Sequence, residues 1–219
     1  MLREIEADIV ALQEVSSQRD VGRVDQGAYL AAETERYAVE GPTFGRGPRS
    51  YGNVLLSRWQ PVAVRRVDLS VPNREPRGAI DVDIEIESKV IRFVATHFGL
   101  RRAERRWQVR SLLAAAADRQ GDFSVVAGDF NEWLPGSRSL GAIDRRFGAA
   151  PRLRTFPSRR PTFALDRIWV HPSAALADVT VHATPLARVA SDHLPIRARI
   201  ALSKRIEDEK SGSRRRGEA

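Results

Sequence analysis

The sequence VVAGDFN, residues 125–131, has the pattern of a buried strand that ends at a polar edge. Two valines and an alanine are typical of a strand covered on both faces, and the glycine that follows permits a sharp change of backbone direction. Asp129 and Asn131 stand one residue apart, so their side chains project to the same side, where they can serve a metal or a reacting group. The alternative is an ordinary turn, because Asp and Asn readily hydrogen-bond their own backbone.

A second polar edge, SDHLPI at residues 191–196, opens the last apolar run of the chain. Its Asp192 and His193 complement the residue types of the first edge. Between the two edges, Asp166 interrupts the apolar run at 165–170. A carboxylate inside such a strand requires a hydrogen-bonded partner, and a basic histidine is the natural one.

Two more polar residues follow apolar runs. Glu14 ends the run at 8–15, and His97 follows the run at 91–96. A carboxylate is a poor core residue unless it has a partner or a metal, although an edge glutamate in water is an equally simple reading. A histidine at a strand end is more often structural than catalytic. Here, however, it is the third case of a reactive residue at the end of an apolar run, which favours a functional role.

The remaining pattern predicts an α/β chain. Asp81, Asp83 and Glu85 alternate with apolar residues, which predicts a strand with a solvated acidic face. Arg77, just before them, is a candidate phosphate contact or, more simply, a surface arginine. The sequence predicts strands at 52–58, 62–69, 78–86, 90–96 and around 179–183, a helix with a basic outer face at 101–119, short helices at 25–36 and 140–147, and otherwise polar loops across 16–50.

Composition indicates one globular domain, residues 1–202, followed by a charged tail at 203–219 that we expect to be disordered. The 219 residues include no cysteine, which excludes disulfides and thiolate zinc sites. We expect a cytoplasmic protein, since no apolar segment resembles a signal peptide or a membrane span. The net charge is +8, of which the tail contributes +2. This charge suits nucleic acid or phospholipid headgroups, but an arginine-rich proteome would give the same value.

Taken in order, these motifs resemble those of the endonuclease/exonuclease/phosphatase superfamily, which includes deoxyribonucleases, apurinic/apyrimidinic endonucleases, inositol-polyphosphate phosphatases and neutral sphingomyelinases. The resemblance extends from residue 5 to about residue 202. It implies a four-layer α/β/β/α sandwich, in which two packed, mostly antiparallel β-sheets are covered by helices. The motifs are LQE at 12–14, TH at 96–97, GDFN at 128–131, LDRI at 165–168 and SDHLP at 191–195.

The resemblance also implies a divalent metal, Mg²⁺ or Mn²⁺, which prefers carboxylate oxygens and keeps several waters. Glu14 would bind the metal, and Asp192 would contribute directly or through water. Whether one or two ions take part is left open.

The same resemblance assigns the proton chemistry. His193, held and kept basic by Asp166, would be the general base or the proton carrier. Asp129 would orient or deprotonate the attacking water, and which of the two takes the proton stays open. Asn131 and His97 would donate hydrogen bonds to the phosphate in the transition state.

One departure from the family pattern concerns the beginning of the chain. Family members usually start with a strand that carries an asparagine near the metal, then a helix, then the strand ending in the metal-binding glutamate. The present sequence begins at that helix. We therefore expect an exposed sheet edge that invites dimerisation, and a weakened metal site.

The sequence thus predicts a metal-dependent phosphoester hydrolase that uses an activated water. The short connection between Asn131 and Asp166 favours small or lipid-linked phosphoesters, and the basic charge favours nucleic acid, so the substrate and the choice between monoester and diester stay open. The alternatives are a catalytically weakened scaffold of the same fold and a nucleic-acid-binding module without catalysis.

Overall fold

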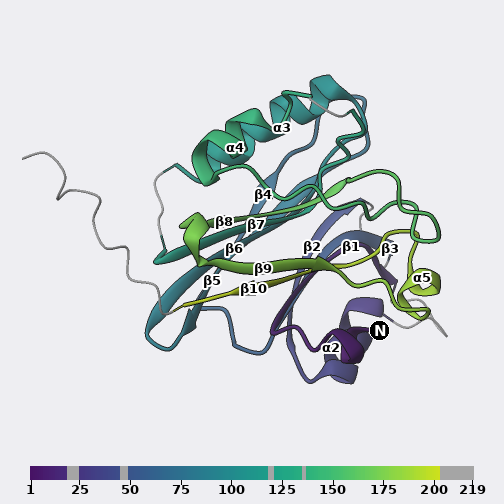
Figure 1. Cartoon of the computed structure of the whole chain (residues 1–219), viewed down its shortest axis with the longest axis vertical. Helices are drawn as coiled ribbons and strands as arrows, with labels where there is room; N and C mark the ends of the chain where they lie inside the picture. The colour runs from purple at the N-terminus through teal and green to yellow at the C-terminus, as the bar shows by residue number, and fades with distance from the viewer. Residues whose placement is uncertain (19–24, 45–48, 118–120, 135–136, 203–219) are drawn as a thin grey trace, which may run out of the picture.

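The computed structural model describes residues 1–18, 25–44, 49–117, 121–134 and 137–202 (Figure 1). The charged tail predicted to be disordered lies outside these residues. Two β-layers face each other, and helices cover their outer sides (Figure 1). This is the predicted four-layer sandwich.

The first layer is a continuous five-stranded sheet with the order β4-β5-β6-β7-β8. All neighbours are antiparallel except β6 and β7, which are parallel because the chain returns between them through the long helix α3. The bounds are β4 Ala63–Asp68, β5 Gly78–Ile86, β6 Lys89–His97, β7 Phe123–Asp129, β8 Asp166–His171 and α3 Arg102–Ala115.

The second layer is divided among the described residues into two antiparallel pieces, one with the order β1-β3-β2 and one formed by β10 and β9. A bulge between Leu12 and Val15 interrupts the pairing of β1 with β3. The bounds are β1 Ile9–Gln18, β2 Tyr37–Phe44, β3 Arg49–Ser57, β9 Leu176–Val181 and β10 Ile196–Ile200.

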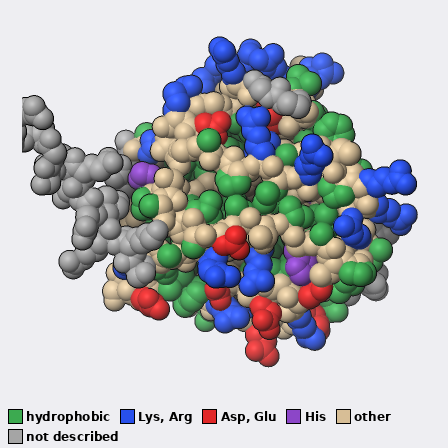
Figure 2. Space-filling view, in the orientation of Figure 1, with side chains coloured by type: hydrophobic (Ala, Val, Ile, Leu, Met, Phe, Trp, Pro, Cys, Tyr) green, Lys and Arg blue, Asp and Glu red, His purple; other side chains and the backbone are tan. Residues whose placement is uncertain are grey.

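The helices form the outer layers. α3 and α4 cover the five-stranded sheet, and α2 lies against β1 and β2 (Figure 1). Figure 2 shows basic side chains gathered over the α3 edge, where Arg102, Arg106 and Arg110 are exposed as the sequence predicts. None of the described helices has the length and apolar character needed to cross a membrane. The remaining bounds are α1 Leu2–Ile5, α2 Gln26–Thr34, α4 Gly141–Phe147, α5 Ala187–Ala190 and the 3₁₀ turn η1 Ser173–Ala175.

Among the described residues, three apolar clusters hold the layers together, and two of them involve the five-stranded sheet. One lies between the sheets and centres on fully buried side chains such as Leu55, Ile80 and Val125. The other lies between the five-stranded sheet and the helices and includes Phe98, Phe130 and Trp169. Phe130 packs edge-on against both other rings, with ring centroids 4.8 and 4.7 Å away. Because β7 contributes to both clusters, its end is fixed from both faces.

The structure corrects the predicted acidic face of β5. Asp81 is only 2% exposed, and two arginines from neighbouring strands, Arg65 and Arg92, bind its carboxylate. Asp83 is half-buried and pairs with Arg65 at 2.7 Å, whereas Glu85 is exposed as predicted. The period of two was correct, but arginines from the neighbouring strands cover the acidic face at Asp81 and Asp83, and only its end at Glu85 reaches solvent. The predicted loop at 16–50 was also wrong in part, since it contains β2 and the end of β1.

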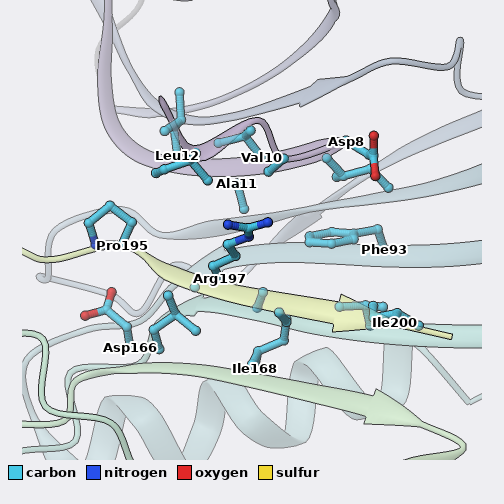
Figure 3. Close-up of a pocket in the computed structure, with 18 of the residues that line it drawn as sticks. Asp8, Val10, Ala11, Leu12, Phe93, Asp166, Ile168, Pro195, Arg197 and Ile200 are labelled. Carbon is cyan, nitrogen blue, oxygen red and sulfur yellow. The ribbon is translucent and has the colours of Figure 1, made fainter. Parts of the chain in front are cut away.

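A cavity of about 480 Å³ lies between the two pieces of the second layer (Figure 3). Its walls are consecutive residues of β1 and β10, and its floor is formed by inner-face residues of β6, β7 and β8. Asp166 and His193 line the same cavity, which therefore lies beside the polar edges picked out in the sequence.

Candidate active site

Three predicted site residues form one row across the five-stranded sheet. His97, the last residue of β6, is paired in register with Asp129, the last residue of β7. Asp129 is in turn paired with Asp166, the first residue of β8. Residues paired in this way on adjacent strands project to the same face of a sheet. The strand endings seen in the sequence therefore meet at a single edge.

Gly128 makes the close approach of β6 and β7 possible. Its φ is +149°, and a Cβ added there would lie 1.8 Å from the carbonyl oxygen of Thr96. Only glycine adopts this conformation without strain, and only glycine leaves room for the neighbouring carbonyl. The sequence predicts a sharp turn at this glycine, but the structure keeps it within β7, paired with Thr96 and Arg167, where it sets how close His97 and Asp129 lie.

Asp129, His97 and Asn131 form a buried hydrogen-bonded group. The backbone N–H of Asn131 donates to Oδ1 of Asp129 at 2.8 Å. Nε2 of His97 lies 3.4 Å from Oδ2 of Asp129 and 3.1 Å from Nδ2 of Asn131. Nδ2 of Asn131 also donates to the carbonyl of Phe98 at 2.9 Å. Asn131 therefore orients His97 in addition to any contact with a substrate.

The environment of Asp129 favours its ionised form. Burial by itself would raise the pKa of this carboxyl group, but the hydrogen bond and charge of His97, the N–H of Asn131 and the charge of His193 outweigh it. The net effect lowers the pKa of Asp129. A carboxylate at this position is thus ionised and can accept a hydrogen bond from water, and its lowered pKa makes it a weak base.

His193 and Asp166 form the pair that the sequence predicts. Nδ1 of His193 lies 2.8 Å from Oδ2 of Asp166, and the hydroxyl of Thr155 donates to the same carboxylate oxygen. Burial acts against the charged imidazole, but the hydrogen bond and charge of Asp166 prevail and raise the pKa of His193 to about 9. The ring also packs against Phe156, with centroids 4.8 Å apart. Since Nδ1 is occupied, Nε2 is the nitrogen that can face a substrate.

The two predicted metal ligands are exposed carboxylates. Glu14 lies in the bulge of β1 with a φ of +58°, a left-handed conformation that is unusual for glutamate. The Tyr51 hydroxyl is hydrogen-bonded to Glu14, and burial together with this bond raises the pKa of the tyrosine. Asp192 lies beside His193, and its carbonyl accepts a hydrogen bond from Ser158.

These carboxylates fit a hydrated ion better than a closed metal cage. Within the described part of the chain, no three or more His, Cys, Asp or Glu residues gather as a metal-binding group. Mg²⁺ commonly binds one or two protein carboxylates and retains its waters. The donor chemistry of Glu14 and Asp192 suits that type of site, whereas it does not suit a structural zinc site.

Two interactions that the sequence did not reveal support the site. Nδ2 of Asn53 on β3 and Oγ1 of Thr96 on β6 both donate to the carbonyl of Gly78, the first residue of β5, at 2.9 and 3.1 Å. They therefore connect β3 and β6 to the start of β5, next to His97 in the chain. Nη2 of Arg105 lies 3.1 Å from Oε1 of Glu132, which fixes the segment after Asn131 to α3. The sequence could have indicated the first interaction, because Asn53 is a polar residue inside an apolar run. Nothing in the neighbouring sequence indicated the pair of Arg105 and Glu132.

The structure also corrects the simpler reading of Arg77. This residue is 5% exposed and is not a surface arginine. Its guanidinium makes two hydrogen bonds to Glu75, at 2.9 and 2.8 Å. Its proposed contact with phosphate stays a prediction.

Comparisons with known proteins agree with this arrangement. The family model described as the Endonuclease/Exonuclease/phosphatase family matches residues 1–193. The uncharacterized protein YbhP of Escherichia coli K12 is 33% identical over 223 residues, which cover 92% of this chain and 86% of YbhP.

Solved structures show the same fold. A family protein from Leptotrichia buccalis has a TM-score of 0.71 at 19% identity, over 91% of this chain and 89% of its own. A mannosyl-6-phosphatase from Bacteroides thetaiotaomicron has a TM-score of 0.67 at 14% identity, over 92% of this chain and 88% of its own. With the family model matching most of its length, the chain belongs to the endonuclease/exonuclease/phosphatase family.

Proposed function

We propose that the protein is a divalent-metal-dependent phosphoester hydrolase. The observation that carries this proposal is the row of His97, Asp129 and Asp166 at one sheet edge, with His193 bound to Asp166. Phosphoester cleavage requires an oriented water, a group that takes its proton and positive charge near the phosphoryl oxygens. In this proposal Asp129 orients the water, Asp129 or His193 takes the proton, and positive charge comes from the metal ion and from the protonated ring of His193. The family name and the similarity to a mannosyl-6-phosphatase support the same type of chemistry.

In the proposed reaction, water attacks phosphorus in line with the leaving oxygen, and the P–O bond to that oxygen breaks. Asp129, ionised and held by two hydrogen-bond donors, orients the water. The water's proton passes to Asp129, or to His193 when its imidazole is neutral. Because the pKa of His193 is raised to about 9, its protonated ring can also donate a proton to the leaving oxygen. In this proposal His97 and Asn131 donate hydrogen bonds to phosphoryl oxygens, which requires Asn131 to exchange a hydrogen bond that it makes to His97 or Phe98. Mg²⁺ or Mn²⁺ beside Glu14 and Asp192 would neutralise charge on the phosphate.

The aromatic surface around His193 favours a phosphoester whose organic group is large enough to pack against it. Trp133 packs edge-on against Phe156 and Phe163, with centroids 5.5 and 5.2 Å apart, and Phe156 contacts His193. Phe163 is 40% exposed. Aromatic surface of this kind packs against a sugar, base or acyl group but makes no favourable packing contact with free phosphate. Nucleic acids and phospholipid headgroups therefore remain among the proposed substrates. We also propose that the protein is cytoplasmic.

The test is hydrolysis of bis-p-nitrophenyl phosphate, p-nitrophenyl phosphate and plasmid DNA with Mg²⁺, Mn²⁺ or EDTA. We expect metal-dependent turnover of at least one substrate and a loss of about 100-fold or more in His193→Ala, because general acid–base catalysis contributes at least that much. His171→Ala is the matched control, since His171 lies at the opposite end of β8 from Asp166 and should leave turnover unchanged.

Two results would contradict the proposal. If His193→Ala retains full metal-dependent turnover, the site lies elsewhere. If the folded wild type is inert on all three substrates, the scaffold alternative gains, and salt-sensitive, metal-independent DNA binding would identify a nucleic-acid-binding module instead.

A further inference from the structure

Large apolar side chains are exposed on the loops that surround the candidate active site. One of these loops follows β6, one follows β7, one precedes β8 and one contains α5. Together they hold half of the large apolar side chains that are exposed among the described residues. A single exposed leucine needs no explanation, but a group of such side chains around one site indicates an interaction surface. The five side chains and their exposed fractions are Leu100 (61%), Leu134 (59%), Phe163 (40%), Leu186 (48%) and Val189 (70%).

The loops after β6 and β7 are held together by a buried ion pair. Arg105 donates to the carbonyl of Leu100 at 2.6 Å, and its Nη2 lies 3.1 Å from Oε1 of Glu132. The backbone N–H of Leu134 lies 3.4 Å from the same oxygen of Glu132. The two exposed leucines therefore lie on loops that one pair of buried side chains connects.

The loop before β8 joins this pair of loops to α5. Phe163 packs against Trp133, the neighbour of Leu134, with ring centroids 5.2 Å apart. The hydroxyl of Ser158 donates to the carbonyl of Arg188 in α5 at 3.1 Å, and Arg188 donates back to the carbonyl of Ser158 at 2.9 Å. Figure 1 shows α5 and the green segment before β8 on the same side of the molecule. The four loops thus form one continuous surface around the site.

These loops, which we call the rim, also carry positive charge. The rim comprises residues 98–102, 133–134, 137–140, 151–164 and 184–191. Its sequence contains eight arginines and no Asp or Glu. Of the acidic residues that flank it, Glu132 is paired with Arg105, and Asp192 is a proposed metal ligand. Four rim arginines are exposed and make no ion pair with another described residue: Arg102, Arg138, Arg159 and Arg160.

An anionic lipid surface fits this combination better than nucleic acid does. Four of the five exposed apolar side chains are aliphatic, and an aliphatic side chain offers no ring on which a base can stack. Leucine and valine are favoured in the acyl region of a bilayer, and arginines bind the phosphates of its headgroups. Trp133 and Phe163 are typical of the boundary between these two regions. A protein partner at the rim would instead cover the edge that a substrate must reach.

We propose that the rim docks on the surface of a membrane that contains anionic phospholipids. The exposed leucines and Val189 enter the outer part of the acyl region, and the rim arginines contact headgroup phosphates. The edge that carries the candidate active site then faces the lipid, so the phosphoester that enters the site is one anchored in the bilayer. Docking itself does not depend on catalysis, whereas this choice of substrate rests on the proposed function.

The first test is co-sedimentation of the whole chain with vesicles made of equal parts of phosphatidylcholine and phosphatidylglycerol. Binding is measured in EDTA, which stops metal-dependent hydrolysis and so keeps docking separate from the proposed function. We expect saturable binding that weakens with salt and is at least about tenfold weaker to vesicles of phosphatidylcholine alone. If all substrates stay intact in the hydrolysis assays but this binding is found, the proposed function fails and docking stands.

The second test follows insertion with a single cysteine, because the chain contains none. Val189→Cys lies on the rim, and Val62→Cys is the matched control. The two valines are similarly exposed, but Val62 lies beside Asp83, toward the opposite end of the five-stranded sheet from His97. A nitrobenzoxadiazole label at position 189 should brighten and shift to the blue with the anionic vesicles, whereas the same label at position 62 should not change.

Substitutions separate the apolar and the charged contributions. Leu134→Ser combined with Val189→Ser should weaken binding at least about tenfold, whereas Val62→Ser should leave it unchanged. Arg160→Glu should weaken binding at least about fivefold, because it reverses a charge at the lipid surface. Arg199→Glu is its control, an exposed arginine at the end of β10 away from His193, and should have a smaller effect. Circular dichroism verifies that each variant is folded.

Several outcomes would overturn the proposal. One is the absence of binding to the anionic vesicles by the folded wild type. Another is equal brightening of the labels at positions 62 and 189, which would indicate adsorption without a defined surface. DNA binding that survives the Leu134→Ser and Val189→Ser substitutions, without vesicle binding, would assign the rim to nucleic acid. Brightening at position 189 that depends on protein concentration alone would assign it to a second copy of the chain.

Discussion

The five-stranded sheet and the layer packed against it differ in continuity, and the two halves of the site differ in the same way. His97, Asp129 and Asp166 are fixed by strand pairing within the continuous sheet. Glu14, Asp192 and His193 belong to the divided layer and its loops, where a bulge and side-chain bonds position them. We infer that the continuous sheet provides the rigid half of the site and the divided layer the adjustable half. Substitutions matched across the two layers test this difference.

The largest effect is expected at Gly128. Gly128→Ala places a methyl group against the Thr96 carbonyl and should destabilise the protein by more than about 4 kcal/mol or prevent folding. Gly27→Ala, in the helix on the divided layer, is the control. Its nearest contacts would be 3.4 Å away, so the free energy of unfolding should change by less than about 1 kcal/mol. Urea denaturation of both variants gives the comparison, and equal losses would refute it.

The next largest effect concerns ion pairs. Arg92→Leu removes a buried partner of Asp81 and should cost about 3 kcal/mol, because Arg65 compensates only in part. Arg58→Leu removes the exposed pair between Arg58 and Asp8, at the edge of the divided layer, and should cost less than about 1 kcal/mol. If chemical denaturation ranks the two variants in the opposite order, the five-stranded sheet is not the more tightly fixed layer.

The smallest of these effects involves the pair that joins the layers. In metal-free protein, the His193 ring should titrate near pH 9 by NMR, and Asp166→Asn should move its pKa toward 6.5 while the His171 signal stays in place. A raised pKa stabilises the folded protein fully below pH 6.5, and this contribution is lost as the pH rises through 9. The wild type should therefore be more stable than Asp166→Asn at pH 6, and this difference in the free energy of unfolding should shrink by about 1–2 kcal/mol at pH 10. The figure is reduced for solvent screening, because the pair is partly exposed. A pH-independent difference would count against the pair.

Much of the fold follows from local patterns in the sequence. The predicted strand at 78–86 matches β5 to the residue, and the predicted helices overlap α2, α3 and α4. The resemblance to the family identified His193 as the partner of Asp166. From the residues alone, the sequence predicts that a carboxylate in an apolar strand needs a basic partner such as a histidine. These inferences required only what a residue can tolerate in its immediate surroundings.

What the sequence concealed depends on contacts between distant residues. Asp81 looks solvated until Arg65 and Arg92 are placed beside it, 16 and 11 residues away in the chain. Thr155 reaches Asp166 from a loop that has no distinctive composition. Neither contact follows a repeating pattern of residues in the sequence, so the spacing of residues cannot predict it.

The left-handed backbone of Glu14 has a consequence for how the protein changes under selection. Gly or Asn would adopt this conformation with less strain, at a saving on the order of 1 kcal/mol, but neither provides a carboxylate. If Glu14 binds the metal as proposed, a substitution at position 14 that raises thermostability lowers activity. A library selected only for heat resistance should drift toward glycine or asparagine there, whereas one selected for turnover should retain glutamate.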